Sequence, residues 1–215
     1  MPRVVTASLL SAAVVALAVG CGGGDDAPDE NSGGSAMGAE ASGDNSDDLT
    51  ATLVDAKGTE VGTAEFSEDE DGLKVKVEVT GLPPGFHGFH VHSVGMCEPD
   101  SASPTDPTMK GDFLSAGGHI GAGDSDHGEH PGDLPSLYVD RSGAGSLDFV
   151  TDALTLGDLT DDDGSAVMVH EGRDNYANIP ERYAAEGPDE MTLNTGDAGA
   201  RIACGPIQGS GQAGS

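Results

Sequence analysis

Alternating apolar and polar positions mark the clearest local structure in the chain. In LKVKVEVT at 73–80, one face carries Leu73, Val75, Val77 and Val79, and the other face carries lysines, a glutamate and a threonine. A repeat of two residues is the period of a strand that buries one side. Shorter apolar segments predict further strands at 49–56 and 61–66.

The same reasoning predicts strands later in the chain. SLYVDRSGAGSLDFV and GSAVMVHE give three more, the first segment being split by a turn at SGAG, and RIACGPI closes the domain. Short strands separated by turns are typical of an antiparallel sandwich or barrel. All eight Phe and Tyr residues lie in the same part of the sequence. We therefore expect one all-β domain over 49–207.

Two stretches do not have the pattern of strands, at about 95–135 and 172–200. Both are rich in Gly, Pro and Asp. Connections of that length in a compact domain are usually functional or tied down. The 34 Gly and 12 Pro of the chain favour turns over long helices. We expect two long functional loops.

The start of the chain has the pattern of an export signal. Arg3 precedes an uncharged apolar stretch that ends in AVG before Cys21. A basic start, an apolar stretch and small residues at a cleavage site define a secretory signal, here 1–20. AVG-Cys resembles the bacterial lipoprotein box and predicts a lipid on Cys21; the alternative is ordinary cleavage nearby. The chain is then exported, and is either anchored to the outer face of the cell membrane through Cys21 or secreted.

Charge and composition narrow the functional classes. Residues 22–48 hold eight acids and no base, which predicts a disordered acidic linker over 21–48, and 208–215 is predicted as a flexible tail. The net charge of −29 argues against a nucleic-acid binder and against docking on an anionic membrane through a basic patch. The acidity indicates solubility. It leaves the oligomeric state open, with a homodimer as one option.

Three cysteines are present, Cys21, Cys97 and Cys204. Export places them in an oxidising compartment, where an odd cysteine needs an explanation. If Cys21 carries a lipid, Cys97 and Cys204 remain as one pair.

Seven histidines carry the chemistry. His90 and His92 are two apart on an expected strand, so both imidazoles share a face, opposite Phe89 and Val91. Two imidazoles on a rigid strand suit copper or zinc, although His-x-His on an exposed face is common. His170 ends another expected strand.

The first long loop holds a second set of candidate ligands. His119, His127, His130 and Asp133 fall within fifteen residues and form a full tetrahedral set for zinc. The alternative is a hydrophilic loop with scattered histidines. His87 has no matching partner and is predicted to be a structural, hydrogen-bonding histidine.

At this level of detail the sequence resembles the copper/zinc superoxide dismutases, specifically their exported bacterial branch. The resemblance rests on GFHGFHVHSVGMCEP, SAGGHIG, HPGDLPSLYV, VMVHEGRDNY and TGDAGARIACGPI, which occur in the family's order and span nearly all of 49–207. NYANIPERY and the signal are similar to actinobacterial lipoprotein members. The resemblance implies a Greek-key antiparallel β-barrel or sandwich of about eight strands.

The resemblance also assigns roles to residues. His90, His92 and His170 match copper ligands, His119 matches the imidazole shared by copper and zinc, and the zinc set is completed by His127, His130 and Asp133. Asp174 matches a carboxylate that orients a ligand of each metal; the alternative is a turn-forming residue. Cys97 and Cys204 match the intrasubunit disulfide. The spacing of His127 and His130, three residues, is shorter than in eukaryotic members.

Arg201 matches the arginine beside the copper that guides superoxide; the alternative is a salt bridge closing the last strand. The implied function is dismutation of superoxide by copper cycling between Cu(II) and Cu(I), with copper and zinc as cofactors, in extracytoplasmic antioxidant defence. Two other classes stay open: a surface lipoprotein that binds copper and zinc without turnover, and a structural β-domain with a decayed site.

Overall fold

The computed structural model describes residues 48–209. The predictions for the signal, for Cys21 and for the linker up to residue 47 lie outside the described residues, as do those for 210–215. Within the described range, no helix combines the length and apolar character needed to cross a membrane.

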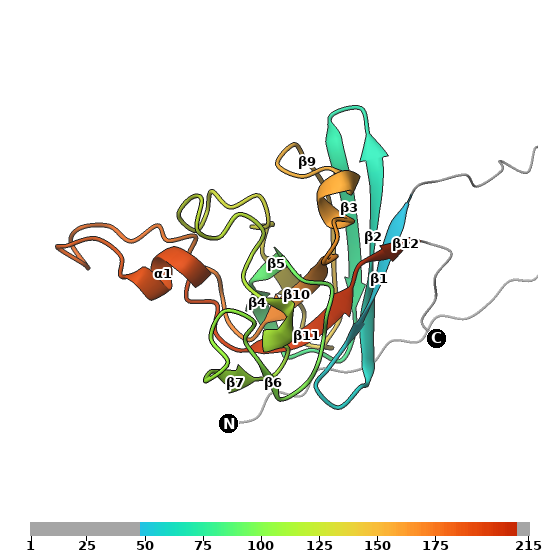
Figure 1. Cartoon of the computed structure of the whole chain (residues 1–215), viewed down its shortest axis with the longest axis horizontal. Coiled ribbons are helices and arrows are strands. Elements are labelled where there is room, and N and C mark those ends of the chain that lie inside the picture. Colours follow the sequence, from blue (N-terminus) through green and yellow to red (C-terminus); the bar gives the residue numbers. More distant parts are fainter. Residues whose placement is uncertain (1–47, 210–215) are drawn as a thin grey trace, which may run out of the picture. The chain divides into compact units, whose positions relative to one another are not determined.

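Ten strands form one antiparallel sheet (Figure 1). They run in the order β4-β8-β9-β3-β2-β1-β11-β10-β5, with β12 paired to β1. Strands occur at every position that the apolar pattern predicts, which confirms the all-β antiparallel fold. Their bounds are β1 Leu49–Val54, β2 Glu60–Asp69, β3 Gly72–Val79, β4 Gly85–His87, β5 Phe89–His92, β8 Leu137–Val139, β9 Gly145–Thr151, β10 Ala166–His170, β11 Arg201–Pro206 and β12 Gln208–Gly209.

The sheet curls into a nearly closed barrel because its two ends are neighbours in sequence. β4 and β5 stand at opposite ends of the strand order, and only Gly88 separates them. Gly88 N donates to Gly172 O at 2.8 Å, and Gly88 O accepts from His170 N at 2.8 Å. With β4 and β5 counted as one interrupted strand and two-residue β12 set aside, ten strands become the predicted eight.

The barrel interior is filled by one face of each strand. In β3 the buried positions alternate with more exposed ones, as the sequence predicts for 73–80. Phe66, Val75, Val77 and Phe89 are completely buried in this main core. Burial of such side chains is the largest favourable contribution to folding. The packed core therefore gives rigid support to the side chains on the opposite face of β5 and β10.

The two long connections hold more structure than the sequence predicts. The first contains β6 Ser101–Ala102, β7 Lys110–Gly111 and the 3-10 turn η1 Leu114–Ala116, and the second contains helix α1 Glu190–Thr195. A second 3-10 turn, η2 Leu156–Leu159, lies between β9 and β10. Figure 1 shows α1 to the left of β5 and β10, on the side opposite the long hairpin β2–β3, and shows β6 and β7 below β5 and β10.

One predicted boundary needs correction. The domain was expected to end at 207 and to be followed by a flexible tail, but Gln208 and Gly209 pair with Thr50 and Leu49. The backbone of β1 offers unpaired hydrogen-bonding groups beside Leu49, and pairing satisfies them. The sheet therefore extends to residue 209.

Candidate metal centre

β5 and β10 bring three histidines to one face outside the main core. Phe89 and Val91 belong to the main core, so the intervening His90 and His92 point the other way. Across the ladder, His90 is paired with Met168 and His92 with Ala166, which belong to a second, smaller buried cluster. The predicted placement of both imidazoles on one face is confirmed. His170 follows on the same side of β10.

The first long loop covers this face, and for that reason the histidines are buried rather than exposed. It adds isolated bridges between His92 and His119 and between His90 and Asp133. Gly132 has to be a glycine here, because a Cβ atom would overlap the carbonyl oxygen of Val91. The loop thereby delivers its own ligands to the strand ligands.

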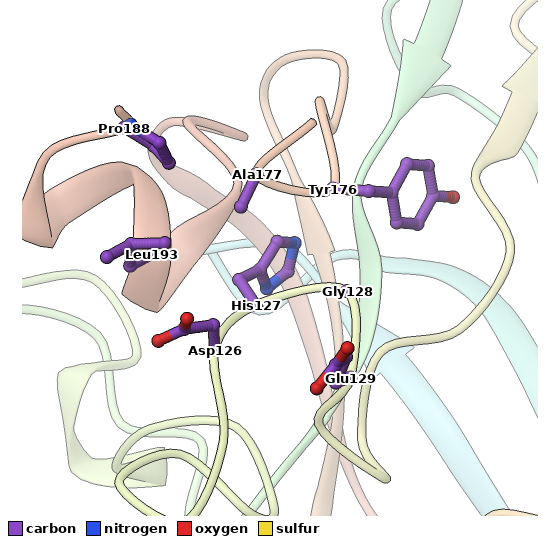
Figure 2. Close-up of a pocket in the computed structure, with 8 residues that line it drawn as sticks. All are labelled: Asp126, His127, Gly128, Glu129, Tyr176, Ala177, Pro188 and Leu193. Carbon is purple, nitrogen blue, oxygen red and sulfur yellow. The ribbon is translucent and has the colours of Figure 1, made fainter. Parts of the chain in front are cut away.

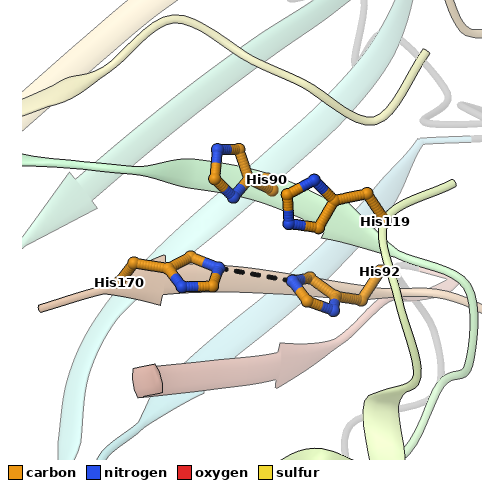
Figure 3. Close-up of side chains that lie close together, drawn as sticks. All are labelled: His90, His92, His119 and His170. Carbon is orange, nitrogen blue, oxygen red and sulfur yellow. Dashed lines mark hydrogen bonds between the residues drawn. The ribbon is translucent and has the colours of Figure 1, made fainter. Parts of the chain in front are cut away.

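Four histidines form the first cluster: His90, His92, His119 and His170. All are buried, and one nitrogen of each lies within 4.8 Å of the others. The rings of His90 and His119 are 4.1 Å apart between centroids. Figure 3 shows the four rings facing one another, with Nε2 of His92 3.4 Å from Nε2 of His170.

The other nitrogen of each strand histidine has an outward partner. Nδ1 of His92 donates to Gly117 O at 2.9 Å, and Nδ1 of His170 donates to Gly199 O at 3.1 Å. A carbonyl only accepts, so each contact fixes the proton on Nδ1 and leaves Nε2 as a free lone pair. An all-imidazole set of this kind suits copper or zinc.

The second cluster consists of His119, His127, His130 and Asp133. Three Nδ1 atoms converge on the Asp133 carboxylate, from His119 at 2.8 Å, from His127 at 3.1 Å and from His130 at 3.2 Å. Three imidazoles and one carboxylate are a common tetrahedral zinc set. The predicted loop ligands are therefore brought together, and His119 belongs to both clusters.

Asp174 joins the two clusters. Its Oδ2 accepts from His90 Nε2 at 2.7 Å and its Oδ1 accepts from His127 Nε2 at 2.8 Å. The carboxylate is fully buried. It contacts one member of each cluster through the nitrogen that faces away from the cluster centre. Asp174 therefore contacts a histidine of each cluster, and its role in orienting metal ligands stays a prediction.

Two buried histidine nitrogens that make no hydrogen bond indicate whether the clusters fit metal ions. Within the described part of the chain, His90 Nδ1 and His127 Nδ1 are the buried side-chain atoms that make no hydrogen bond; His127 Nδ1 lies 3.1 Å from Asp133 Oδ1, but the contact does not have hydrogen-bond geometry. One lies in each cluster. A buried polar nitrogen without a partner is destabilising, and a coordinated cation removes that penalty. The residues fit two metal ions.

Electrostatics favour neutral imidazoles in the first cluster. Burial, followed by the neighbouring histidines, holds the pKa of His92 and of His170 well below the usual value. Burial likewise lowers the pKa of His119 to about 4, although its hydrogen bond to Asp133 opposes the shift. Metal ligation requires neutral imidazoles, so these rings are prepared for it at neutral pH.

The second cluster is more polar. Burial lowers the pKa of His127, but contacts with Asp133 and Asp174 outweigh burial and raise it to about 9. Burial opposes ionisation of the two carboxylates, yet their histidine partners keep the pKa of Asp133 and of Asp174 below the usual range. Two ionised carboxylates give this half of the site a negative charge that attracts a divalent cation.

Arg201 lies beside the first cluster. It pairs with His170 across β10 and β11, and its guanidinium donates to Phe113 O and Gly117 O, both at 2.6 Å. Its partners are backbone carbonyls, so the alternative of a salt bridge is wrong. Burial lowers the pKa of Arg201 to about 10, which leaves it charged at neutral pH. Gly117 O also accepts from His92, which ties the cation to the cluster.

A disulfide holds the same loop in place. Cys97 and Cys204 are joined, as the sequence predicts, across 107 residues. Cys204 packs with Phe113 and Ala116 in the smaller buried cluster, and Phe113 belongs to the loop that accepts from Arg201. The bond therefore fixes the segment that orients Arg201.

His87 is structural, as predicted. It is buried, and its two ring nitrogens face His170 O at 2.7 Å and Pro83 O at 2.8 Å. It belongs to neither metal cluster of the described residues. Its role is to attach β4 to the end of β10.

A cavity of about 510 Å³ borders the second cluster. Figure 2 shows it between the 126–129 turn and α1, with His127 on its wall. Tyr176 and Ala177 form one side, while Asp126 and Glu129 give another side negative charge. The outer surface of the second cluster is thus close to solvent, whereas the first cluster lies under the covering loop.

Comparisons with known proteins identify the family. The family model described as "Copper/zinc superoxide dismutase (SODC)" matches residues 60–207. The chain belongs to the copper/zinc superoxide dismutase family. As a member it is an enzyme of superoxide dismutation, and its family's cofactors are copper and zinc, which the two histidine clusters fit.

Relatives support the assignment over most of the chain. A curated superoxide dismutase (Cu-Zn) of Mycolicibacterium paratuberculosis is 48% identical over 167 residues, covering 74% of this chain and 73% of the relative. The Cu/Zn superoxide dismutase structure from Brucella abortus is 34% identical with a TM-score of 0.58, covering 75% of this chain and 99% of that one.

The crystal structure of a SOD-like protein from Bacillus subtilis is 30% identical to this chain with a TM-score of 0.52, covering 73% of this chain and 95% of that one.

Several contacts at the site were not predicted from the sequence. The carbonyls of Gly117, Gly199 and Ser125 orient His92, His170 and His130. Every residue has a carbonyl, so no residue type marks these positions in the sequence. The TGDAG segment contains Gly196, whose closeness to Asp174 appears only in the fold.

Proposed function

We propose that His90, His92, His119 and His170 bind copper, that His119, His127, His130 and Asp133 bind zinc, and that the chain dismutates superoxide through alternate reduction and reoxidation of the copper. Copper supplies a one-electron centre, which zinc cannot supply, and zinc supplies a fixed positive charge. Over one cycle two superoxide anions and two protons give dioxygen and hydrogen peroxide.

The observation that carries this proposal is the position of His119. Its Nδ1 faces Asp133 in the second cluster, which leaves Nε2 for the first cluster. One imidazole shared by two sites places two cations close together, a costly arrangement in a protein that only stores metal. It is useful when one of the two ions has to change its charge during turnover.

The chain's own residues relay a proton taken up from solvent and supply the substrate contact. His119 Nε2 is the atom at which a proton can be held between the two half-reactions and passed to the departing peroxide. Asp174 keeps the His90 and His127 rings in place while this happens. Arg201, held by two carbonyls, presents a fixed cation to the anionic substrate.

Copper dependence tests the catalytic half of the proposal. Removing metal with a chelator should abolish superoxide decay, copper alone should restore it, and zinc alone should not. Superoxide decay would be measured with metal content determined on the same samples. A protein that binds both metals stoichiometrically but does not accelerate decay would instead be the metal-binding surface lipoprotein, and activity without detectable copper would refute the mechanism.

Zinc binding is tested with His127→Ala. We expect the variant to lose zinc and thermal stability because metal binding is linked to folding, while retaining some activity near neutral pH. Asp124→Ala is the matched control, since Asp124 is exposed in the same loop and lies outside both clusters. Elemental analysis of the wild-type chain should give two metals; one metal per chain would contradict the zinc assignment.

We further propose that the enzyme works outside the cytoplasm, in antioxidant defence, anchored through a lipid on Cys21 or secreted. The disulfide supports this, because such bonds persist in oxidising compartments. Cell fractionation of the wild type and of Cys21→Ser tests it. Membrane association that is lost in the variant supports the lipid; wild-type protein that remains in the cytoplasm refutes export.

A further inference from the structure

Asp174 has a third partner that belongs to neither metal cluster. The same Oδ1 that accepts from His127 also accepts from the backbone N of Tyr176 at 2.7 Å. In the same turn, Tyr176 and Ala177 adopt φ angles of 54° and 52°. Side chains other than glycine disfavour this left-handed region, so the turn persists only if its surroundings hold it.

The Tyr176 side chain provides that hold. Its hydroxyl accepts from Ser136 N at 2.8 Å, contacts Ser136 Oγ at 2.9 Å and donates to Leu134 O at 3.4 Å. Leu134 directly follows Asp133, the carboxylate of the second cluster. Figure 2 shows the ring directed away from the Asp126 and Leu193 sides of the cavity.

Two further contacts connect Tyr176 to the same cluster. Its ring lies nearly parallel to His127, at 16° with centroids 6.3 Å apart. Its carbonyl oxygen would be 2.7 Å from a Cβ on Gly128, so the turn after His127 fits closely against it. Tyr176 thus contacts the loop that carries the second cluster while its backbone holds Asp174.

Packing alone does not explain a tyrosine at this position. The residue is 38% exposed, so much of its surface stays in water. The features that distinguish it from other side chains are the hydroxyl, which joins the 174–177 turn to the 134–136 segment, and a ring that lies nearly parallel to that of His127.

We propose that Tyr176 is a positioning residue of the metal centre. Its hydroxyl attaches the 174–177 turn to the 134–136 segment, and the turn fixes Asp174, which in turn orients His127 and His90. Tyr176 itself contacts neither the metal positions nor the substrate. This inference rests on the proposed function, because it takes His127 as a zinc ligand.

Two substitutions separate the hydroxyl from the backbone conformation. Tyr176→Phe keeps the ring and removes the hydroxyl, whereas Tyr176→Asn suits the left-handed φ but removes both hydroxyl and ring. Tyr183→Phe is the matched control, since Tyr183 is 76% exposed and contacts Arg182 through its ring face. Each protein is stripped of metal, and zinc affinity is measured by competition with a chelator.

We expect Tyr176→Phe and Tyr176→Asn to bind zinc about tenfold more weakly, the lower end of the loss seen when a ligand's outer partner is removed. Co²⁺ placed in the zinc site should show a changed visible spectrum in both variants, whereas Tyr183→Phe should match the wild type. A merely structural role would lower the melting temperature of the metal-free protein and leave the Co²⁺ spectrum unchanged.

The outcomes distinguish this inference from the proposed function. Wild-type zinc affinity and Co²⁺ spectrum in Tyr176→Phe would overturn the inference alone. Full affinity in Tyr176→Asn would do the same, by showing that the backbone conformation suffices. A wild-type chain that binds neither zinc nor Co²⁺ would overturn the zinc assignment and this inference with it.

Discussion

At the scale of single residues, the metal centre depends on the nitrogen that each histidine turns away from the metal position. Backbone carbonyls accept from three of them: Gly117 O from His92, Gly199 O from His170 and Ser125 O from His130. The carboxylate of Asp174 accepts from His90 and His127. A carbonyl fixes which nitrogen carries the proton. The lone pairs that face the metal positions are therefore set by the backbone fold around the histidines.

Gly196 shows how little space this arrangement leaves. It ends α1 with φ 58°, and a Cβ there would overlap Asp174 Oδ1 and His127 Nε2. We expect Gly196→Ala to weaken zinc binding more than tenfold, because Asp174 and His127 have to move. Zinc affinity measured by chelator competition checks this.

Gly187→Ala is the control for backbone strain. Gly187 has φ 83° but no atom within 4 Å of its Cβ position. Its replacement should lower the free energy of unfolding by about 1–2 kcal/mol, the usual penalty of a left-handed alanine, and leave zinc affinity unchanged. Equal zinc affinity in Gly196→Ala and Gly187→Ala would show that the close contact of Gly196 with Asp174 does not determine zinc binding.

The ligands themselves could be identified in the sequence because their chemistry is in the side chain. His90 and His92 follow strand periodicity, and His127, His130 and Asp133 lie close together in one loop. The pairing of His90 with His127 through Asp174 joins residues up to 84 positions apart. No local pattern contains that contact, and only the family resemblance indicated it.

At the scale of elements, strands were predictable and short irregular elements were not. β3 buries every second residue, so its pattern is visible in the sequence. α1 has only six residues, too few for a helical period to show. Its ends do have signals: Asp189 accepts from Thr192 N at its start, and Gly196 follows its last residue. Such signals are reliable only next to a longer apolar pattern.

The disulfide acts at this scale because it joins β11 to the first long loop. Replacing both Cys97 and Cys204 by Ala should lower the free energy of unfolding by about 4–5 kcal/mol, as the chain-entropy estimate gives for a loop of this length. Urea unfolding of metal-loaded samples measures it.

The same double variant should increase amide exchange around Phe113 and Gly117, since their segment loses its covalent attachment. Dismutation should then decrease, because Arg201 is oriented by these two carbonyls. Unchanged exchange in this segment would show that packing alone holds the loop.

At the scale of the whole molecule, the charge opposes the substrate. Residues 49–207 contain 8 bases and 30 acids, a net charge of −22, while superoxide is an anion. Guidance depends on the local field rather than on net charge. Arg201 and two bound cations would give a positive region within an acidic surface, so the contribution of Arg201 should depend on how far the surrounding charges are screened.

Salt dependence measures this contribution. Arg201→Glu should lower the dismutation rate, and most strongly at low ionic strength, where the screening length is about 30 Å at 0.01 M rather than about 8 Å at 0.15 M. Arg201→Lys should lose less, since it keeps the charge but not the pair of parallel donors. Copper content is measured in each sample. Equal rates at equal copper occupancy would show that Arg201 only supports the loop.

The position of β5 has a consequence for solubility. β5 is the last strand of the sheet, and its free edge is paired only by the metal-carrying loop: Val91 N donates to Gly132 O, and Val91 O accepts from Ile120 N, each at 2.9 Å. An unpaired edge strand is a template for another chain. Because His119 and Asp133 sit in this loop, zinc bound there as we propose would also hold the loop on the edge. We therefore expect the metal-free chain to aggregate more readily than the zinc-loaded chain.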